Sequence, residues 1–292
     1  MPRAGIVTVA GKPNVGKSTL LNRIVGQKLS ITSPKPQSTR DRIVGIYTSE
    51  DSQLVILDTP GLLNPKYPLQ QAMRSTAVRA LEEADVIIYL ADATEGMPPS
   101  LAEAAELSTP PKAPVIVALN KSDALNPVRR EELASIDGVV LVSALTGDGV
   151  PDLMARVARL LPESPFLYPE DEISTQPVRF FVAELVRETV LEQLHDEVPY
   201  SVAVQVEEFR EGRSPLYIRA VIYVERESQK AIIIGGKGAR IKSIGEAARK
   251  KTETFLGEKV YLDLWIKVLP NWRKNPGSLS RFGYQLATGK GK

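Results

Sequence analysis

Residues 11–18 read Gly-Lys-Pro-Asn-Val-Gly-Lys-Ser and match the phosphate-loop pattern GxxxxGK[ST]. A β-branched apolar run at residues 6–10 comes directly before them, and residues 18–25 have helical spacing. Glycines let backbone N–H groups point inward at phosphates, with the N-terminus of the following helix behind them. The flanking strand and helix argue against a chance match, so this stretch predicts a nucleotide-binding α/β domain.

Residues 58–61, Asp-Thr-Pro-Gly, follow another apolar run and predict the chemistry around the phosphates. Asp58 can hold Mg²⁺ through water, and the N–H of Gly61 can approach the γ-phosphate because no Cβ blocks it. Lys17 would reach the β- and γ-phosphates, and the Ser18 hydroxyl would bind Mg²⁺. Taken alone, residues 58–61 would only indicate a turn; their place after the phosphate loop gives them this role.

Base identity is predicted from residues 120–123, Asn-Lys-Ser-Asp. A carboxylate at Asp123 can accept hydrogen bonds from both N1–H and the N2 amino group of guanine, a pair that adenine does not offer. Ser143 and Ala144, after a further apolar run, would bring a backbone N–H to guanine O6. The motifs predict GTP and GDP rather than ATP. The predicted nucleotide-binding residues are Gly11, Asn14, Val15, Gly16, Lys17, Ser18, Thr19, Asp58, Gly61, Asn120, Lys121, Asp123, Ser143 and Ala144.

The polar, proline-rich residues 33–40 lie between the phosphate loop and Asp58. Thr39 is the predicted Mg²⁺ ligand of this segment, ordered only when GTP is bound. The alternative is a plain loop in which Ser38 or neither residue binds metal. We therefore predict the metal ligands and catalytic residues as follows: Ser18, Thr39 and Asp58 for Mg²⁺, and Lys17, Thr39 and Gly61 for catalysis.

Leu62 and Leu63 stand where many GTPases have a glutamine that orients the attacking water. A leucine cannot orient water, so we predict slow intrinsic hydrolysis and a different device for positioning water. Asn14 is polar and could help to bind a monovalent cation, K⁺, beside the phosphates. The alternative is that Asn14 simply caps the loop.

The composition excludes several function classes. The 292 residues contain no cysteine and a single histidine, His195, which excludes thiolate chemistry, cysteine metal sites and paired-histidine mechanisms. No apolar run approaches the roughly 20 residues of a membrane span, and the N-terminus leaves no room for a signal peptide. We therefore expect a cytoplasmic protein. The formal net charge is only +2, so nucleic-acid affinity would have to come from the distribution of charge.

Apolar runs alternate with amphipathic stretches in the first part of the chain, which predicts a mostly parallel, doubly wound sheet. Four prolines in residues 162–177 predict a semi-rigid spacer. Beyond it, the order helix, strand, strand, helix, glycine loop, helix, strand predicts a smaller α+β domain. The expected parts are residues 1–165, a linker at 166–177, and residues 178–292 with a C-terminal tail. Strands are expected at 6–9, 43–47, 54–57, 86–90, 115–119, 139–142, 201–209, 216–223 and 260–268, and helices at 18–25, 70–82, 100–107, 128–135, 151–161, 180–194, 228–234 and 239–255.

Residues 235–238, Gly-Gly-Lys-Gly, lie between two predicted helices. Such a GxxG loop lets an RNA backbone approach closely, with helix N-terminal amides facing phosphate. Ile232, Ile233, Ile234 and Ile241 would form an apolar floor under the bases. Arg240, Lys242, Arg249, Lys250 and Lys251 follow on the next helix, a concentration of positive charge that supports RNA binding. The alternative is a tight helix–turn–helix with a solvated basic face and isoleucines in the core. The predicted RNA-binding residues are Ile234, Gly235, Gly236, Lys237, Gly238, Arg240, Lys242 and Arg249.

The tail from residue 272 to residue 284 interleaves aromatic with basic residues. Trp272 and Tyr284 could stack on bases. The alternative, of equal weight, is that both pack on the domain surface and that the last residues of the chain are disordered.

Residues 11–18, 35–40, 58–61 and 120–123, followed by residues 232–241, closely resemble the Era family of bacterial GTPases, over nearly the whole chain. The resemblance implies a G domain joined to a KH-type RNA-binding domain of the α-β-β-α-α-β kind. It also implies binding near the 3′ end of 16S ribosomal RNA during assembly of the 30S subunit, and peripheral membrane association. The family also has an apolar residue after Asp-Thr-Pro-Gly, and it usually has threonine where Ser38 stands, which keeps the hydroxyl.

Other functions remain open from the residues alone. One is a GTPase switch whose second domain acts on a protein or on another structured RNA; the GxxG loop and its basic helix count against the protein partner. Another is a passive RNA-binding module that uses nucleotide only for stability. We expect a monomer with Mg²⁺ as cofactor, K⁺ as a further candidate, and GTP, GDP, 16S rRNA and the 30S subunit as partners.

Overall fold

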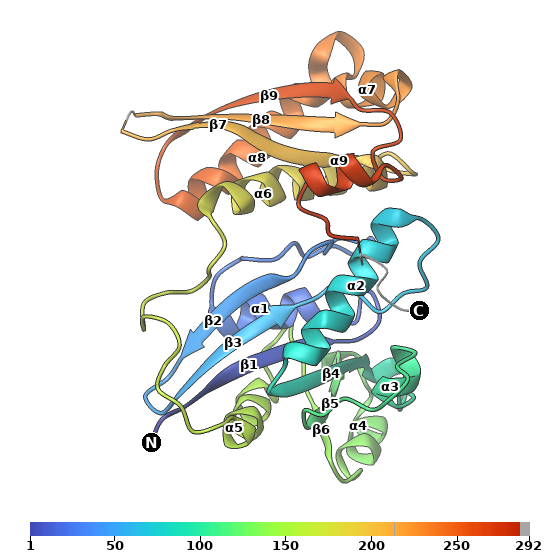
Figure 1. Cartoon of the computed structure of the whole chain (residues 1–292), viewed down its shortest axis with the longest axis vertical. Coiled ribbons are helices and arrows are strands. Elements are labelled where there is room, and N and C mark those ends of the chain that lie inside the picture. The colour runs from blue at the N-terminus through green and yellow to red at the C-terminus, as the bar shows by residue number, and fades with distance from the viewer. Residues whose placement is uncertain (213, 287–292) are drawn as a thin grey trace. The chain divides into compact units, whose positions relative to one another are not determined.

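The computed structural model describes residues 1–212 and 214–286, and the chain divides into two compact units (Figure 1). The first unit comprises Met1–Pro65 and Ala72–Thr175, and the second comprises Lys66–Gln71 and Gln176–Lys292. The boundaries expected from the sequence stay a prediction, although the first unit already contains most of the expected linker.

Six strands form the sheet of the first unit, in the order β2-β3-β1-β4-β5-β6 (Figure 1). β2 runs antiparallel to β3 and the other pairs are parallel, which confirms the predicted mostly parallel sheet. The chain changes sides at β1, so the loop after β1 lies at the point where such sheets bind ligands. The strands are β1 Arg3–Ala10, β2 Ile43–Thr48, β3 Ser52–Asp58, β4 Val86–Asp92, β5 Val115–Asn120 and β6 Val139–Leu141.

The helices between these strands follow the amphipathic stretches of the sequence. α3 is the one predicted poorly, because it ends three residues before the predicted residue 107. Glu106 has a left-handed φ of +49°, which an α-helix cannot continue through. The helices are α1 Lys17–Val25, α2 Pro68–Glu83, α3 Leu101–Ala104, α4 Pro127–Ala134 and α5 Val150–Leu160.

The segment after α5 is hydrogen-bonded to the first unit. Gln53 Oε1 accepts hydrogen bonds from the N–H groups of Leu167, at 2.7 Å, and Tyr168, at 2.9 Å. The N–H of Ile46, on the edge strand β2, donates to the carbonyl of Ile173 at 2.9 Å. The prolines keep this segment irregular, and groups of β2 and β3 supply its hydrogen bonds.

The second unit has the predicted α-β-β-α-α-β order, followed by one short helix. Its strand order is β7-β8-β9, with β7 antiparallel and β9 parallel to β8. Alternate residues of β8, such as Ile218 and Ile222, pack in the core with Val182 of α6 and Ile244 of α8. The elements are α6 Val178–Gln193, β7 Ala203–Arg210, β8 Leu216–Val224, α7 Glu227–Ile234, α8 Ala239–Leu256, β9 Val260–Val268 and α9 Pro276–Arg281.

The tail is part of the packed structure. Asn275 caps α9, a start signal that the asparagine–proline pair carries in the sequence. Trp272 is fully buried, and its Nε1 donates to the carbonyl of Ser201 at 2.7 Å. The ring of Tyr284 stacks on Trp272 with 6.4 Å between the ring centres. The packing interpretation therefore holds for Trp272 and Tyr284, and the expectation about the last residues, 287–292, lies outside the described residues.

Candidate functional site

The loop after β1 folds around the side chain of Lys17. The Nζ atom of Lys17 donates hydrogen bonds to the backbone carbonyls of Gly11, at 3.2 Å, and Lys12, at 2.8 Å. Gly16 has a φ of +99°, and a Cβ atom there would lie 2.2 Å from the side-chain nitrogen of Asn120. The backbone thus curls around a buried ammonium group, and glycine is required where the loop touches its neighbour.

Burial perturbs the two charged groups at the centre of the site. It lowers the pKa of the Lys17 ammonium to about 8, although the charge of Asp58 acts in the opposite direction. Burial also raises the pKa of the Asp58 carboxyl, against the attraction of Lys17 and hydrogen bonds from Ser30, Ser18 and Thr39. A phosphate in this loop would favour the protonated form of Lys17. The positive charge of Lys17 would in turn stabilise the bound anion.

The lowered pKa of Lys17 predicts a pH-dependent stability of the nucleotide-free protein. Between about pH 8 and pH 10.5 the unfolded chain holds a proton at Lys17 that the folded chain has released, so the contribution of Lys17 to the free energy of unfolding rises with pH across this window. The slope approaches about 1.4 kcal/mol per pH unit. Urea unfolding across the window measures this slope, and Lys17→Met should remove it. Lys12→Met changes an exposed lysine and should retain it; equal slopes in all three proteins would contradict the assignment.

Three oxygen-bearing side chains meet beside Lys17. Ser18 Oγ donates to Asp58 Oδ2 at 2.7 Å and lies 2.9 Å from Thr39 Oγ1. The other carboxylate oxygen, Asp58 Oδ1, is buried and has no hydrogen-bond partner within the described part of the chain. Hydroxyl and carboxylate oxygens are ligands that Mg²⁺ takes, together with water. The three predicted metal residues therefore lie together, and the unsatisfied oxygen fits a hydrated cation.

Two residues of this cluster were missed in the sequence. Ser30 Oγ donates to Asp58 Oδ2 at 2.7 Å. Asn22 of α1 holds Ser30 in place, because its Nδ2 donates to the Ser30 carbonyl at 2.8 Å and its Oδ1 accepts from the Ser30 N–H, also at 2.8 Å. Asparagine is a weak helix former, so Asn22 directly after two leucines of α1 was the available signal.

Asn120 joins three of the predicted motifs at the base end of the site. Its Nδ2 donates to the carbonyl of Val15 at 2.7 Å, and its Oδ1 accepts from the N–H of Ala144 at 2.8 Å. Asp123 Oδ1 accepts from Ser143 Oγ at 2.6 Å, which orients the carboxylate. In the structure the N–H of Ala144 already donates to Asn120 Oδ1. The predicted hydrogen bond from this N–H to guanine O6 therefore stays a prediction.

These groups surround one cavity of about 540 Å³, within the range of small-ligand sites. Lys121 lines it with its Nζ held by Asp92 Oδ2 at 2.6 Å. Neither leucine after Gly61 offers a polar group: Leu63 lines the cavity, and Leu62 is buried in the core. Of the predicted nucleotide and metal residues, Asn14, Gly16, Lys17, Ser18, Thr19, Thr39, Gly61, Asn120, Lys121, Asp123 and Ala144 line the cavity, whereas Gly11, Val15, Asp58 and Ser143 do not.

The Gly-Gly-Lys-Gly loop of the second unit has an open outer side. Gly235 and Gly238 have left-handed φ angles of +70° and +78°, and Lys237 has a φ of +51°. An added Cβ atom at Gly236 or Gly238 would meet nothing within 4 Å, whereas one at Gly235 would lie 2.7 Å from Arg240 Cβ. A polymer backbone can therefore approach the tip closely, with the exposed side chain of Lys237 beside it.

A groove of about 740 Å³ lies between α8 and β9. Lys242 and Arg249 line it from the predicted set, together with Ile241, Leu262 and Leu264. Lys259 and two glutamates, Glu246 and Glu253, also line it, and Arg249 pairs with Glu253 at 3.2 Å. Cationic groups beside an apolar floor suit a polymer that carries both phosphates and bases. Arg240 does not line the groove, because its guanidinium donates to the carbonyl of Ile232 at 3.0 Å, and neither do Ile234 and the four loop residues.

Two expectations about this region are wrong. Ile233 is fully buried in the core, as the alternative expected, so it cannot lie under bases. Lys251 does not add to the positive charge available for RNA on α8, because it forms ion pairs with Glu188, at 2.8 Å, and Glu192, at 2.6 Å, both on α6. Helical spacing turns consecutive residues to different faces, which separates Ile233 from the half-exposed Ile232.

The two units together define a class of protein: a P-loop GTPase domain followed by a KH domain. A family model described as a 50S ribosome-binding GTPase matches residues 6–121, and a KH-domain model matches residues 197–273. The chain is a member of the GTPase Era family. It is 42% identical over 291 residues to GTPase Era of Carboxydothermus hydrogenoformans, covering 97% of this chain and 98% of the relative. It is 42% identical over 281 residues to GTPase Era of Thermotoga petrophila, covering 93% and 94%.

Solved structures of Era share the fold over nearly the whole of this chain. A variant of Era from Aquifex aeolicus bound to GDP and AlF₄⁻ is 42% identical, with a TM-score of 0.90, and covers 97% of this chain and 100% of that chain. Era in complex with MgGDPNP and nucleotides 1506–1542 of 16S ribosomal RNA is also 42% identical, with a TM-score of 0.90, and covers 98% and 100%. The predicted GTPase domain with a C-terminal KH domain is confirmed.

Proposed function

We propose that this GTPase binds 16S ribosomal RNA near its 3′ end through the second unit and acts in assembly of the 30S subunit. The observation that carries the proposal is the open GxxG loop, together with a groove between α8 and β9 that has an apolar floor and is lined by Lys242 and Lys259, in a chain that also holds a guanine-nucleotide site. The solved relative that contains both MgGDPNP and nucleotides 1506–1542 supports it.

In the first unit, Lys17 would exchange its two carbonyl acceptors for phosphate oxygens. Ser18, Thr39 and Asp58 would hold Mg²⁺, which when bound supplies positive charge to the β- and γ-phosphate oxygens. Gly61 lets the turn after β3 lie against the phosphate loop, because a Cβ atom there would lie 2.6 Å from a backbone nitrogen of that loop. The backbone N–H of Gly61 is then available to the γ-phosphate.

Asn120, Lys121 and Asp123 would hold the guanine base at the other end of the cavity. The apolar residues after Gly61 leave the attacking water without a side chain to orient it there, so hydrolysis is slow on its own. We propose that binding of the RNA or of the 30S subunit accelerates it. GTP turnover measured with and without a 16S fragment of nucleotides 1506–1542 tests this proposal. A rate that stays unchanged when the fragment is bound would overturn the acceleration, and failure of the fragment to bind would overturn the RNA-binding function.

The proposed organisation is a G domain at residues 1–165, a linker at 166–177 and a KH domain with its tail at 178–292. We propose a cytoplasmic monomer, with peripheral membrane association as the family resemblance implies. Among the residues that the structure describes, no helix is long and apolar enough to cross a membrane.

Ser30 is proposed to orient the Asp58 carboxylate for Mg²⁺. Ser30→Ala removes one hydrogen bond to a buried carboxylate, which costs about 1.5–3 kcal/mol when the acceptor is charged. We expect the Mg²⁺ concentration for half-maximal GTP binding to rise at least about tenfold. Titration of Mg²⁺ against a fluorescent GTP analogue measures it, and Ser30→Thr, which keeps the hydroxyl, should stay close to the wild type. An unchanged Mg²⁺ requirement in Ser30→Ala would remove Ser30 from this role.

Asn14 is proposed to support a K⁺ ion beside the phosphates. In the structure its Nδ2 donates to the carbonyl of Pro34 at 2.9 Å, which also fits the loop-capping alternative. Cation support predicts faster GTP hydrolysis in K⁺ than in Na⁺, and Asn14→Ala should erase the difference. Equal rates of the wild type in the two salts would leave Asn14 with the capping role.

A further inference from the structure

The sheet of the second unit has one face that α6 and α8 do not cover. Even-numbered residues of β8 enter the core, so odd-numbered residues of β8 and β9 point to the other face. The strand register places Tyr217 beside Tyr261 and Arg219 beside Asp263. Tyr261 and Trp265 are 58% and 52% exposed, and they are the aromatic residues among the large exposed hydrophobic side chains of the described chain.

The residues around α9 cover only one end of this face. Tyr223, near the end of β8, is 2% exposed, and its ring centre lies 5.1 Å from that of Phe282. The guanidinium of Arg281 lies 5.0 Å from the same ring. The aromatic side chain near α9 is therefore covered, whereas Tyr261 and Trp265 stay exposed on the part of the face that α9 does not reach.

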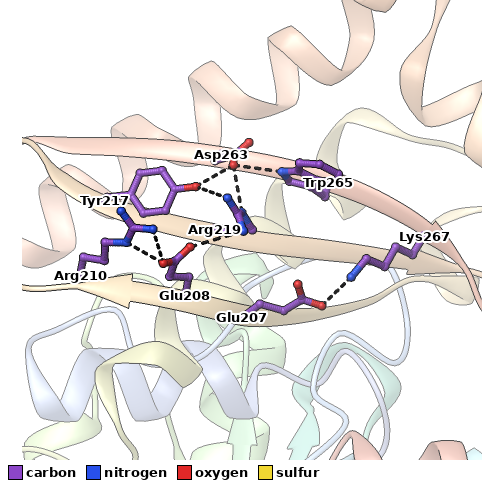
Figure 2. Close-up of polar contacts among 8 residues, drawn as sticks. All are labelled: Glu207, Glu208, Arg210, Tyr217, Arg219, Asp263, Trp265 and Lys267. Carbon is purple, nitrogen blue, oxygen red and sulfur yellow. Dashed lines mark hydrogen bonds and ion pairs between the residues drawn. The ribbon is translucent and has the colours of Figure 1, made fainter.

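Asp263 fixes the aromatic side chains in position. Its Oδ2 accepts hydrogen bonds from Tyr217 Oη at 2.9 Å, Arg219 Nε at 3.1 Å and Trp265 Nε1 at 3.0 Å (Figure 2). The ring of Tyr217 stacks on Tyr261 with centres 5.8 Å apart and planes 14° from parallel. Because these side chains are held before any ligand arrives, a partner would lose little conformational entropy in ordering them.

The charged groups of this face neutralise one another. A β-bulge between Val206 and Glu208 lets two consecutive glutamates of β7 reach side chains of this face (Figure 2). Each basic residue that the strands β7, β8 and β9 place on this face lies against an acidic one, so the strands add little net charge to attract phosphate and offer ring surface instead. The pairs are Arg210 with Glu208, Arg219 with Asp263 and Glu208, and Lys267 with Glu207.

This face is continuous with the groove between α8 and β9. β9 is the last strand of the sheet, so its outer edge separates the face from the groove. Tyr261 contributes to both surfaces, because it lines the groove and also stacks on Tyr217 of the open face. A strand of RNA that leaves the groove over this edge meets Tyr261 first and Trp265 about 13 Å further along the same strand face.

We propose that Tyr261 and Trp265 form a base-stacking platform for single-stranded RNA that continues from the groove over β9. The proposal rests on the RNA-binding function proposed above and adds a second contact surface to it. Stacking on an aromatic ring tolerates any base, so the platform adds affinity and length dependence rather than sequence specificity. A protein partner on this face is the competing occupant, which continuity with the groove does not favour.

The test compares two RNA probes on the full-length protein. One is an oligonucleotide of about four nucleotides, the length that a GxxG loop clamps, and the other is the fragment of nucleotides 1506–1542. We expect Trp265→Ala and Tyr261→Ala each to weaken binding of the fragment about tenfold. Trp265→Ala, which changes no residue of the groove lining, should leave the short probe unchanged. Trp265→Phe, which keeps a ring, should restore most of the affinity. Leu160→Ala, an exposed hydrophobic residue of α5, is the control.

Tryptophan fluorescence gives a second readout. Trp265 is half exposed and Trp272, the other tryptophan, is fully buried, so a base stacked on Trp265 should quench the exposed emission. The quenching should disappear in Trp265→Phe, whose remaining tryptophan is buried. Because stacking releases few counterions, the affinity ratio of wild type to Trp265→Ala should stay constant as salt rises.

Each outcome has one interpretation. If Trp265→Ala and Tyr261→Ala bind the fragment as tightly as the wild type, and the fragment does not quench the wild-type fluorescence, the platform is overturned. The groove would then remain the proposed RNA site. Loss of binding to a purified ribosomal protein in these variants, with RNA affinity intact, would assign the face to a protein and also overturn it. Failure of the wild type to bind either RNA would remove the proposed RNA-binding function itself.

Discussion

Asp123→Asn is expected to move nucleotide preference from GTP towards XTP. The carboxylate can accept from both N1–H and the N2 amino group of guanine, whereas an amide nitrogen would face the N2 amino group as a second donor. Xanthine has a carbonyl at C2, which accepts from the new amide. We expect GTP affinity to fall about a hundredfold, since a charge-assisted hydrogen bond is lost and one donor is left without an acceptor.

Asp123→Asn should change base recognition without disturbing the fold. Asp123 is exposed at the cavity and its Oδ1 accepts from Ser143 Oγ at 2.6 Å, a bond that an amide oxygen can also accept. Competition of GTP and XTP against a fluorescent GDP analogue measures both affinities. Asp137→Asn changes an exposed carboxylate outside the cavity and should change neither. Unchanged GTP affinity in Asp123→Asn would place the base elsewhere.

Changing Gly236 and Lys237 together to Asp is expected to weaken RNA binding about a hundredfold, because two carboxylates then face phosphate and the counterion release at Lys237 is lost. The fold should tolerate the change. A Cβ atom at Gly236 meets nothing within 4 Å, and aspartate adopts the left-handed φ of +51° found at Lys237 more readily than most residues. GTP affinity and basal hydrolysis should be nearly unchanged, since no residue of this loop lines the nucleotide cavity.

A matched control separates this effect from bulk charge. Thr109→Asp with Lys112→Asp makes the same change of charge on an exposed loop of the first unit and should leave RNA binding unaffected. Titration with the fragment of nucleotides 1506–1542 at several salt concentrations measures affinity and its salt dependence. Wild-type affinity in the loop variant would remove the RNA site from this loop, and loss of GTP binding would show that the two halves of the chain do not act independently.

The sequence predicted the elements whose signals are local. The phosphate loop, the guanine motif and the GxxG loop each place their main groups within a few residues, and strand periodicity placed most strands within two residues of the observed bounds. The missed features depend on tertiary contacts. Ser30 acquires its role only because Asn22 presents it to Asp58, and Ile233 and Lys251 are turned towards the core and α6 by the position of each helix on the sheet. The polar network of Asp263 is likewise visible only once β8 and β9 are paired in register.

The docked segment after α5 gives the molecule an internal reporter. The amide proton of Ile46, on the outer edge of β2, is held by the carbonyl of Ile173, and Ser174 Oγ donates to the carbonyl of Val44 on the same strand at 2.5 Å. While the segment stays docked, the Ile46 amide is shielded from hydrogen exchange with solvent. β2 begins three residues after Arg40, the last residue of the segment that carries Thr39. A rearrangement of that segment that releases residues 173–174 from β2 would therefore raise the hydrogen-exchange rate of the Ile46 amide. An unchanged exchange rate would mean that the segment leading into α6 stays bound to β2.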